Sequence, residues 1–466
     1  MSELPRPVQR TSVPRRERVR VVATVMIGTI STILAATIVN VAFPAIMREL
    51  DVGHDTLQWV STAFLAATTT TMLGTAWSIE TWGERRTFIA ALALFLAGSA
   101  LGALAWNATS LIAARTLQGA TAGVLQPLAM VALFRVFPAE ERGRAMGLYG
   151  FGIVLAPAIG PALGGALVDA FGWRSIFLLP LPFCLAGLAL AVFTLPDTRG
   201  RGNMPFDWRG TLLLIGALVA LLNVTVLGHR LGWLSAALLG LGAVGIGLSL
   251  AFIAWENRAP SPLLMLPLFR HRPFASASIV SFAYGLGLFG TTYLMPVFVQ
   301  DIAAYNASEA GYLLLPPGIA LAVAIMAGGR LADRIQPRFV IVAGLVLFAL
   351  SSLLLAFAGA ATGFWLLTAW LVIGRAGLGM LIPALNVGAV ASLSGTELAY
   401  ASSSVNFVRQ LGGAVGVNVL AVLLEWRLGT YGPANAARAF HECFALVTLA
   451  FAVAIMPAWS IRKTRR

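Results

Sequence analysis

The sequence predicts an all-α polytopic membrane protein, and both its composition and the length of its apolar runs indicate this fold class. Of the 466 residues, 58% are hydrophobic and only 11% are charged, whereas a soluble domain is normally about one quarter charged. Apolar runs recur from Val21 to Ile461, and a run of about 20 residues matches the hydrocarbon thickness of a bilayer. These runs are predicted to be helices, because open sheet edges are excluded from lipid.

The apolar runs divide the chain into fourteen predicted membrane spans, separated by short polar stretches. The predicted spans are 21–45, 57–79, 87–106, 109–135, 144–168, 175–195, 210–228, 234–255, 274–299, 309–330, 338–358, 363–391, 399–424 and 441–461.

The placement of basic residues tests this count. If the N-terminal tail lies inside and the chain alternates across the membrane, 24 of the 32 Lys and Arg residues fall inside and five fall outside. The other three, Arg115, Arg375 and Arg409, lie within spans. Because positive loops stay on the cytoplasmic side, we expect both termini to be cytoplasmic and the protein to lie in a bacterial cytoplasmic (inner) membrane.

Two long polar connections, Pro196–Arg209 and Glu256–Pro273, divide the spans into six, two and six. The predicted organisation is two pseudo-symmetric six-helix bundles with two inserted central helices. The predicted segments are a cytoplasmic tail at 1–20, the first bundle at 21–196, a linker with two extra spans at 197–272, the second bundle at 273–461 and a cytoplasmic tail at 462–466.

Two short loops at matched positions of the bundles indicate an internal duplication. Each follows the second span of its bundle and places an acidic residue five positions before a basic one. Repeats of this kind are common in transporter folds. The candidate gating residues are Glu80, Gly83, Arg85 and Arg86 in the first loop and Gly329, Asp333, Arg334 and Arg338 in the second.

Other classes of function find little support. The net charge of +13 could attract nucleic acid, but the charge sits in short loops and tails, where it orients the chain against anionic lipid. The four histidines and two cysteines show no metal-ligand spacing, and no extramembrane segment is long enough for an enzymatic domain. We therefore expect no catalytic residues, no metal, no cofactor and no nucleic-acid partner.

Polar residues inside spans are candidates for function, because a charge in mid-bilayer costs at least about 2.5–3.5 kcal/mol. Arg115 and Gln118 share a helix face, and Gln126 lies further along that stripe. They are predicted either to line a central cavity or to hydrogen-bond with Thr37 or Asn40 of the first span. Asn386, Asn406 and Arg409 in the later spans leave the same two alternatives open.

The fifth span carries a dense glycine–proline pattern: Pro157, Gly160, Pro161, Gly164 and Gly165. Prolines interrupt the hydrogen-bond ladder of a helix, and glycines four residues apart let another backbone approach closely. The pattern predicts either a bend that seals one face of a moving bundle or a tight, inert helix contact.

Taken in order, these motifs resemble the major facilitator superfamily, in its fourteen-span drug–proton antiporter group of the EmrB/QacA type. Thr37–Pro44 resembles the first-span signature of that group, and the two loops resemble the family's loop after the second helix. Arg115-x-x-Gln118-Gly119 is similar to the fourth-helix motif of the family. In the family, the arginine of this motif is implicated in proton transfer. The glycine–proline pattern is similar to the antiporter motif, and the stretch 409–413 resembles one common in the thirteenth span.

The resemblance implies export of hydrophobic or cationic small molecules in exchange for protons, by alternating access of the two bundles. The first span departs from the family pattern, because Ala35 stands where an aspartate is usual. A proton-coupled carrier needs a group that titrates near neutral pH, and a carboxylate beside Arg115 would be a natural one. This departure favours one alternative, an uncoupled facilitator or nutrient importer. A membrane sensor that does not transport is a second alternative.

The implied partners are a hydrophobic small-molecule substrate and the lipid bilayer. Some family members in two-membrane bacteria work with a periplasmic adaptor protein, so the resemblance implies such a partner only if the protein comes from a two-membrane bacterium. We expect the protein to be a monomer, with H⁺ as the coupling ion.

Overall fold

The computed structural model describes residues 14–197, 200, 202, 204–232, 235–303, 305–391, 393, 396–432 and 435–461, except for the side chains of a few helix residues. The side chains of Pro157 and Pro161 are among these exceptions, and the tails 1–13 and 462–466 lie outside the described residues.

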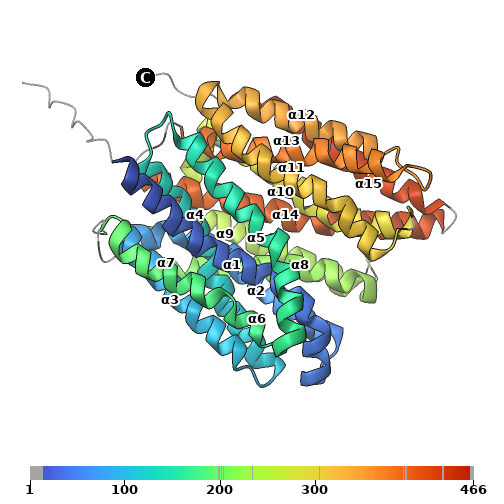
Figure 1. The fold of residues 1–466 in the computed structure, drawn as a ribbon, viewed down its shortest axis with the longest axis horizontal. Coiled ribbons are helices and arrows are strands. Elements are labelled where there is room, and N and C mark those ends of the chain that lie inside the picture. The colour runs from blue at the N-terminus through green and yellow to red at the C-terminus, as the bar shows by residue number, and fades with distance from the viewer. Residues whose placement is uncertain are drawn as a thin grey trace, which may run out of the picture.

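The described chain is almost entirely helical (Figure 1). Its helices are α1 Arg15–Leu50, α2 His54–Trp82, α3 Glu84–Ala103, α4 Ala108–Val136, α5 Arg142–Phe171, α6 Ser175–Leu178, α7 Pro180–Thr194, α8 Trp208–Leu231, α9 Ala236–Glu256, a 3-10 helix Leu266–Arg270, α10 Arg272–Asp301, α11 Ala307–Arg334, α12 Pro337–Leu355, α13 Phe364–Ala389, α14 Thr396–Tyr431 and α15 Ala436–Ala458.

Local chemistry explains several of the helix boundaries. Asn107 begins α4 and Asn306 begins α11, each with a capping box that satisfies backbone N–H groups at the helix start. Gly83 separates α2 from α3 with a φ of 86°, in a region that favours glycine. The predicted sixth span, 175–195, is two consecutive helices that meet at Leu179, directly before Pro180.

Eleven helical segments among the described residues are long and apolar enough to cross a membrane, with α6 and α7 taken together as one. The other three predicted spans, 57–79, 144–168 and 210–228, coincide with α2, α5 and α8. These three helices do not meet the same criterion over their described residues. The protein is therefore a multi-pass membrane protein, and the count of fourteen spans stays a prediction.

The helices before and after the α8–α9 pair pack in the same pattern. In the first set α1 packs against α5 and α7, α2 against α4, and α3 against α4 and α7. In the second set α10 packs against α14 and α15, α11 against α13, and α12 against α13 and α15. These sets, the N-half (α1–α7) and the C-half (α10–α15), are the blue-to-green and yellow-to-red bundles of Figure 1.

The two halves meet through equivalent helices. The second helix of each half contacts the fifth-position helix of the other, since α2 packs on α14 and α11 packs on α5. The α8–α9 pair packs beside this interface through contacts of α8 with α2 and α14. An apolar cluster that includes Met72, Leu73, Leu214, Leu218 and Phe407 joins the pair to the halves.

Candidate functional site

The halves are joined tightly at one end of the bundle, which we call the motif end. It is the end at which α2, α4 and α11 finish and α1, α3, α5 and α12 begin, so it carries both loop motifs. Here the Asp333 carboxylate of α11 accepts hydrogen bonds from the backbone N–H groups of Gly143 and Arg144, each at 2.7 Å. Asp333 thus caps the N-terminus of a helix in the other half, where a negative charge is stabilised by the helix dipole.

Glycines allow the backbones of α5 and α11 to touch at this end. A Cβ added to Gly143 would lie 2.3 Å from the carbonyl oxygen of Gly329, and one added to Gly329 would lie 2.3 Å from that of Gly143. Gly147 and Gly150 continue the contact toward Ile325 of α11. Side chains would hold the halves apart here, so the pair Gly143 and Gly329 permits closure.

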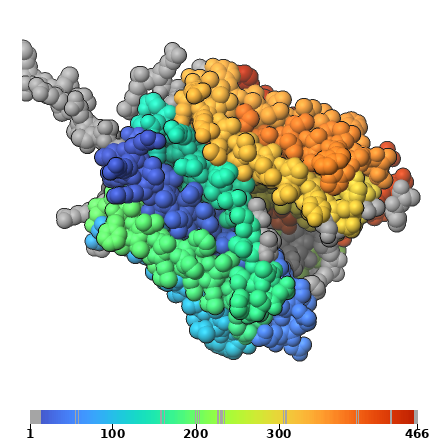
Figure 2. All heavy atoms as spheres, in the orientation of Figure 1, coloured from blue at the N-terminus to red at the C-terminus, as the bar shows by residue number. Residues whose placement is uncertain are grey.

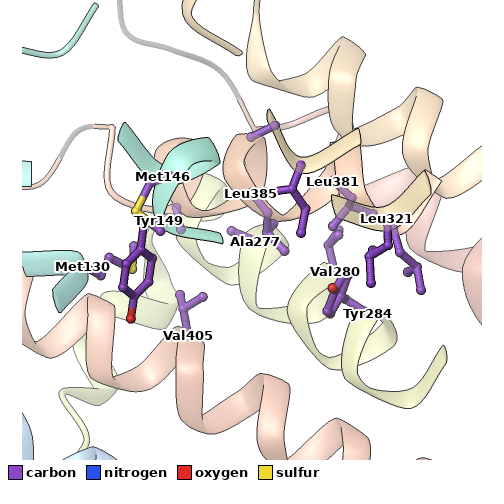
Figure 3. Close-up of a cluster of buried hydrophobic side chains, with 14 of the residues drawn as sticks. Met130, Met146, Tyr149, Ala277, Val280, Tyr284, Leu321, Leu381, Leu385 and Val405 are labelled. Atoms are coloured by element: carbon purple, nitrogen blue, oxygen red, sulfur yellow. The ribbon is translucent and has the colours of Figure 1, made fainter. Parts of the chain in front are cut away.

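Beneath this contact, buried apolar side chains from both halves form what we call the interface plug (Figure 3). Figure 3 shows Tyr149 on one side of the plug and Tyr284 on the other. The labelled members are Met130, Met146 and Tyr149 from the N-half and Ala277, Val280, Tyr284, Leu321, Leu381, Leu385 and Val405 from the C-half.

Toward the opposite end the halves separate. Near the motif end Gly143, Gly147 and Gly150 of α5 lie against α11, whereas farther along the helix Gly160 and Gly164 have residues of α1 as their nearest neighbours. Leu163 of α5 and Leu315 of α11 are 42% and 57% exposed. Figure 2 shows the surface hollowed between the α5 and α11 sides of the molecule. The structure is therefore closed at the motif end and open at the other.

The first loop motif is held by an ion pair that the sequence did not single out. Glu84, whose side chain is fully buried, pairs with Arg135 Nε of α4 at 2.9 Å. Arg85 pairs with Asp197 at 2.7 Å, beyond the end of α7. Glu80 is 8% exposed and Arg86 is exposed. In the second loop Arg338 lies over the Phe339 ring at 4.7 Å, and Arg334 ends α11.

Arg115 lies inside the N-half and is only 1% exposed. Its guanidinium donates to the carbonyl oxygen of Ala35 at 3.1 Å and to Gln118 Oε1 at 3.0 Å, and it stacks over the Phe64 ring at 4.1 Å. Gln118 in turn donates to Ser99 Oγ at 2.8 Å. From the sequence, Thr37 and Asn40 are possible hydrogen-bond partners of this stripe. Neither residue contacts Arg115 or Gln118 in these hydrogen bonds.

This arrangement bears on the Ala35 departure. The position that carries an aspartate in the resembling group supplies a backbone carbonyl to Arg115 instead of a carboxylate. One terminal nitrogen, Arg115 Nη2, is buried with no hydrogen-bond partner among the described residues. A carboxylate at this point would complete the set of acceptors.

Thr37, Asn40 and Gln126 lie apart from this cluster. Thr37 returns its hydroxyl to carbonyl oxygens of its own helix, and exposed Asn40 accepts from Ser61 Oγ at 3.3 Å. Gln126 is half-buried on α4, two turns beyond Gln118.

The glycines of the fifth span face α1 of the same half. A Cβ added to Gly164 would lie 2.4 Å from Ile38 Cγ1, and one added to Gly160 would lie 2.9 Å from Thr37 Oγ1. Gly165 has more room, since its nearest contact is Val41 at 3.7 Å. Helix α5 runs without interruption from Arg142 to Phe171. The motif thus fits α5 closely to α1.

The C-half contributes two more polar residues near the plug. Asn406, 4% exposed, bonds to Arg409 one turn later on α14. The backbone of Arg409 lies against α10, since a Cβ added to Gly285 would lie 1.9 Å from the Arg409 carbonyl oxygen. Asn386 is 3% exposed, and its Oδ1 has no hydrogen-bond partner among the described residues. The plug residues Tyr149 and Tyr284 could not be predicted as interface residues from the sequence, because nothing local distinguishes them from other aromatic residues in spans.

Comparison with known proteins identifies the family. The Major Facilitator Superfamily profile matches residues 25–417, most of the chain. The chain belongs to the major facilitator superfamily. It is 31% identical to the multidrug transporter protein MdtP of Bacillus subtilis over 417 residues, which covers 89% of this chain and 76% of that protein. It is also 31% identical to a multidrug resistance protein B homolog of Mycobacterium tuberculosis over 430 residues, covering 91% and 79%.

A third relative is the methylenomycin A resistance protein of Streptomyces coelicolor, 29% identical over 89% of this chain and 87% of its own. Solved structures share the fold. The human organic anion transporter MFSD10 aligns with a TM-score of 0.69 at 17% identity over 96% of this chain and all of the other. The transporter FucP in its outward conformation aligns with a TM-score of 0.65 at 15% identity, over 94% and 99%. The superfamily consists of transporters, so the chain is a transporter and not an enzyme.

Proposed function

We propose that this transporter exports hydrophobic small molecules by alternating access and exchanges them for protons. The main support is the arrangement of the two halves, closed at the motif end by the Asp333 cap and the plug and separated at the other. Rocking of repeated bundles about a central site is how such folds move substrates. The named drug-resistance relatives support efflux as the direction of transport.

The proposal places the motif end at the cytoplasm, together with both termini, in a bacterial cytoplasmic membrane. The excess of basic residues on that side supports this orientation. The protein then faces outward in this conformation, which is the state that releases an exported substrate. The fourteen-span antiporter group is the proposed subgroup.

A second candidate, an uncoupled facilitator, is favoured by the surroundings of Arg115. The carbonyl of Ala35 stands in place of a carboxylate next to this guanidinium. Among the residues that the structure describes, no carboxylate forms a hydrogen bond or an ion pair with it. A carrier without such a group can move a substrate down its own electrochemical gradient without a proton.

Everted membrane vesicles that contain the protein distinguish these candidates. We expect ATP-independent uptake of at least one of three dyes, cationic ethidium, anionic fluorescein or neutral Nile red, when the vesicle lumen is acidic. Vesicles without the protein serve as the control. Uptake that persists after nigericin collapses the pH gradient would refute antiport and support the facilitator. Failure of all three dyes to accumulate would contradict efflux of hydrophobic molecules.

A further inference from the structure

The arginines at membrane depth differ in how they are satisfied. Arg115 is 1% exposed and is bound by backbone carbonyls and Gln118. Arg375 of α13 and Arg409 of α14 are only half-buried. Both donate hydrogen bonds to neutral side chains: Arg375 donates to Thr292 Oγ1 at 3.0 Å, and Arg409 donates to Asn406 Oδ1.

Among the residues that the structure describes, no carboxylate forms a hydrogen bond or an ion pair with either guanidinium group. Both arginines lie against α10, because Arg375 bonds to Thr292 and a Cβ added to Gly285 would lie 1.9 Å from the carbonyl oxygen of Arg409. Two positive charges at mid-membrane depth without a counter-charge are costly, so this arrangement needs an anion or water to be stable.

The two arginines lie along α10. Helices α11, α13, α14 and α15 of the same half cover α10 on other sides. Thr292, the partner of Arg375, is exposed on α10. Asn406, the partner of Arg409, lies with its Nδ2 atom 3.9 Å from the Sδ atom of Met130, a plug residue of the N-half. The pair thus lies beside the plug, with Arg375 toward the exposed surface of α10.

An aromatic surface lies beside the charges. Phe289 of α10 is 36% exposed, and it packs on Gly413, one turn after Arg409. A Cβ added to Gly413 would lie 2.3 Å from the Phe289 ring. An apolar ring next to guanidinium groups suits a ligand with an aromatic body and a negatively charged group.

We propose that Arg375 and Arg409 bind the anionic group of the transported molecule, and that the substrate class is an amphipathic organic anion such as an aromatic carboxylate or sulfonate. This inference rests on the proposed function, because it names the substrate of the same central site. A monovalent anion that leaves an inside-negative cell moves down the membrane potential, which at about 150 mV supports about 300-fold accumulation outside. The exchanged proton adds its own driving force in the same direction.

Binding to the purified full-length protein tests the charge preference directly. The probes are fluorescein and rhodamine 6G, which share a xanthene ring system but carry opposite charge. We expect fluorescein to bind at least about tenfold more tightly by fluorescence anisotropy, because a hydrogen bond to a charged group is worth about that factor or more. Fluorescein, unlike rhodamine 6G, should also raise the thermal unfolding temperature. Equal binding of the two dyes, or tighter binding of rhodamine 6G, would overturn the proposal.

Substitutions test whether Arg375 and Arg409 are the residues that bind the anionic group. Arg375→Gln and Arg409→Gln should each weaken fluorescein binding about tenfold, while the Lys variants keep most of the affinity. Arg48→Gln removes the same charge from an exposed site at the far end of α1 and should change nothing. If a Gln variant unfolds, the ratio of dye affinities in the Lys variant and the wild type still decides the charge preference. Wild-type affinity in both folded Gln variants would contradict the assignment.

Transport in liposomes separates this inference from the proposed function. With an inside-negative potassium diffusion potential and an outside-acidic pH gradient, we expect the protein to speed fluorescein efflux. Preferential binding of fluorescein without any dye movement would refute transport but leave the anion site standing. Movement of rhodamine 6G with no binding of fluorescein would refute the anion site but leave efflux standing.

Discussion

Removing the Asp333 cap should open the motif end of the transporter. Asp333→Ala deletes two hydrogen bonds of 2.7 Å to the first turn of α5 together with a charge at a helix N-terminus. Such a cap and its interaction with the helix dipole are together worth about 1–2 kcal/mol, which corresponds to a five- to thirtyfold shift between closed and open populations. We expect this contact to break when the motif end opens, so the whole effect should fall on that equilibrium.

A cysteine placed in the plug reports the shift. Met146 is 2% exposed, and both native cysteines, Cys184 and Cys443, are fully buried. In a Met146→Cys background without the native cysteines, a membrane-impermeant maleimide should label the Asp333→Ala protein about five to thirty times faster than its parent. Asp333→Asn keeps one acceptor and should fall between them.

Glycine variants provide the matched comparison. Gly143→Ala forces a Cβ to within 2.3 Å of the carbonyl oxygen of Gly329 and should also speed labelling. Gly311→Ala, on the same helix as Asp333, has nothing within 4 Å of the added Cβ and should leave the rate unchanged. An unchanged rate in both Asp333→Ala and Gly143→Ala would refute the view that these contacts hold the motif end closed.

Three further predictions concern the N-half. Arg135→Gln should lower the unfolding temperature in detergent more than Glu84→Gln, because it leaves a fully buried carboxylate without its ion pair, at a cost of about 3 kcal/mol; the reverse order would contradict this. Gly164→Ala should destabilise by about 1–3 kcal/mol through overpacking against α1, while Gly165→Ala should be close to neutral in the same melts; equal melting temperatures would be evidence against close α5–α1 packing. Ala35→Asp puts a carboxylate beside the buried guanidinium of α4 and should make dye uptake by everted vesicles more dependent on the pH gradient; unchanged dependence would exclude this position as a proton site.

Hydropathy and charge predicted the helices well, because span length and loop charge are local properties. The long connections around residues 196–209 and 256–273 flank the α8–α9 pair, which packs beside two sets of helices with matching contact patterns. The number of spans stays a prediction, because it depends on which of these helices reach both faces of a membrane.

The site was harder to predict, because its contacts join residues far apart in the chain. The loop motif indicated Asp333 as a gating residue, but its partners Gly143 and Arg144 lie 190 and 189 residues away. In the first loop the acidic side chain that is fully buried and ion-paired is that of Glu84. Its partner, Arg135, lies at the end of α4, far away in the sequence.

Arg115 shows the same limit. Its fourth-helix motif was recognisable, and its contact with Gln118 follows from their spacing of three residues. Its other acceptors are backbone carbonyls of α1 and α2, which no side-chain pattern encodes.

The central claim, that the halves rock about a central site, is tested most directly by two spin-label distances between α5 and α11. One pair, Arg144→Cys with Arg330→Cys, spans the motif end, and the other, Phe171→Cys with Tyr312→Cys, spans the opposite end; all four positions are exposed. On addition of a transported dye and a membrane potential, the first distance should lengthen in a fraction of molecules while the second shortens in the same fraction. Two distances that stay fixed, or that change in the same direction, would contradict alternating access.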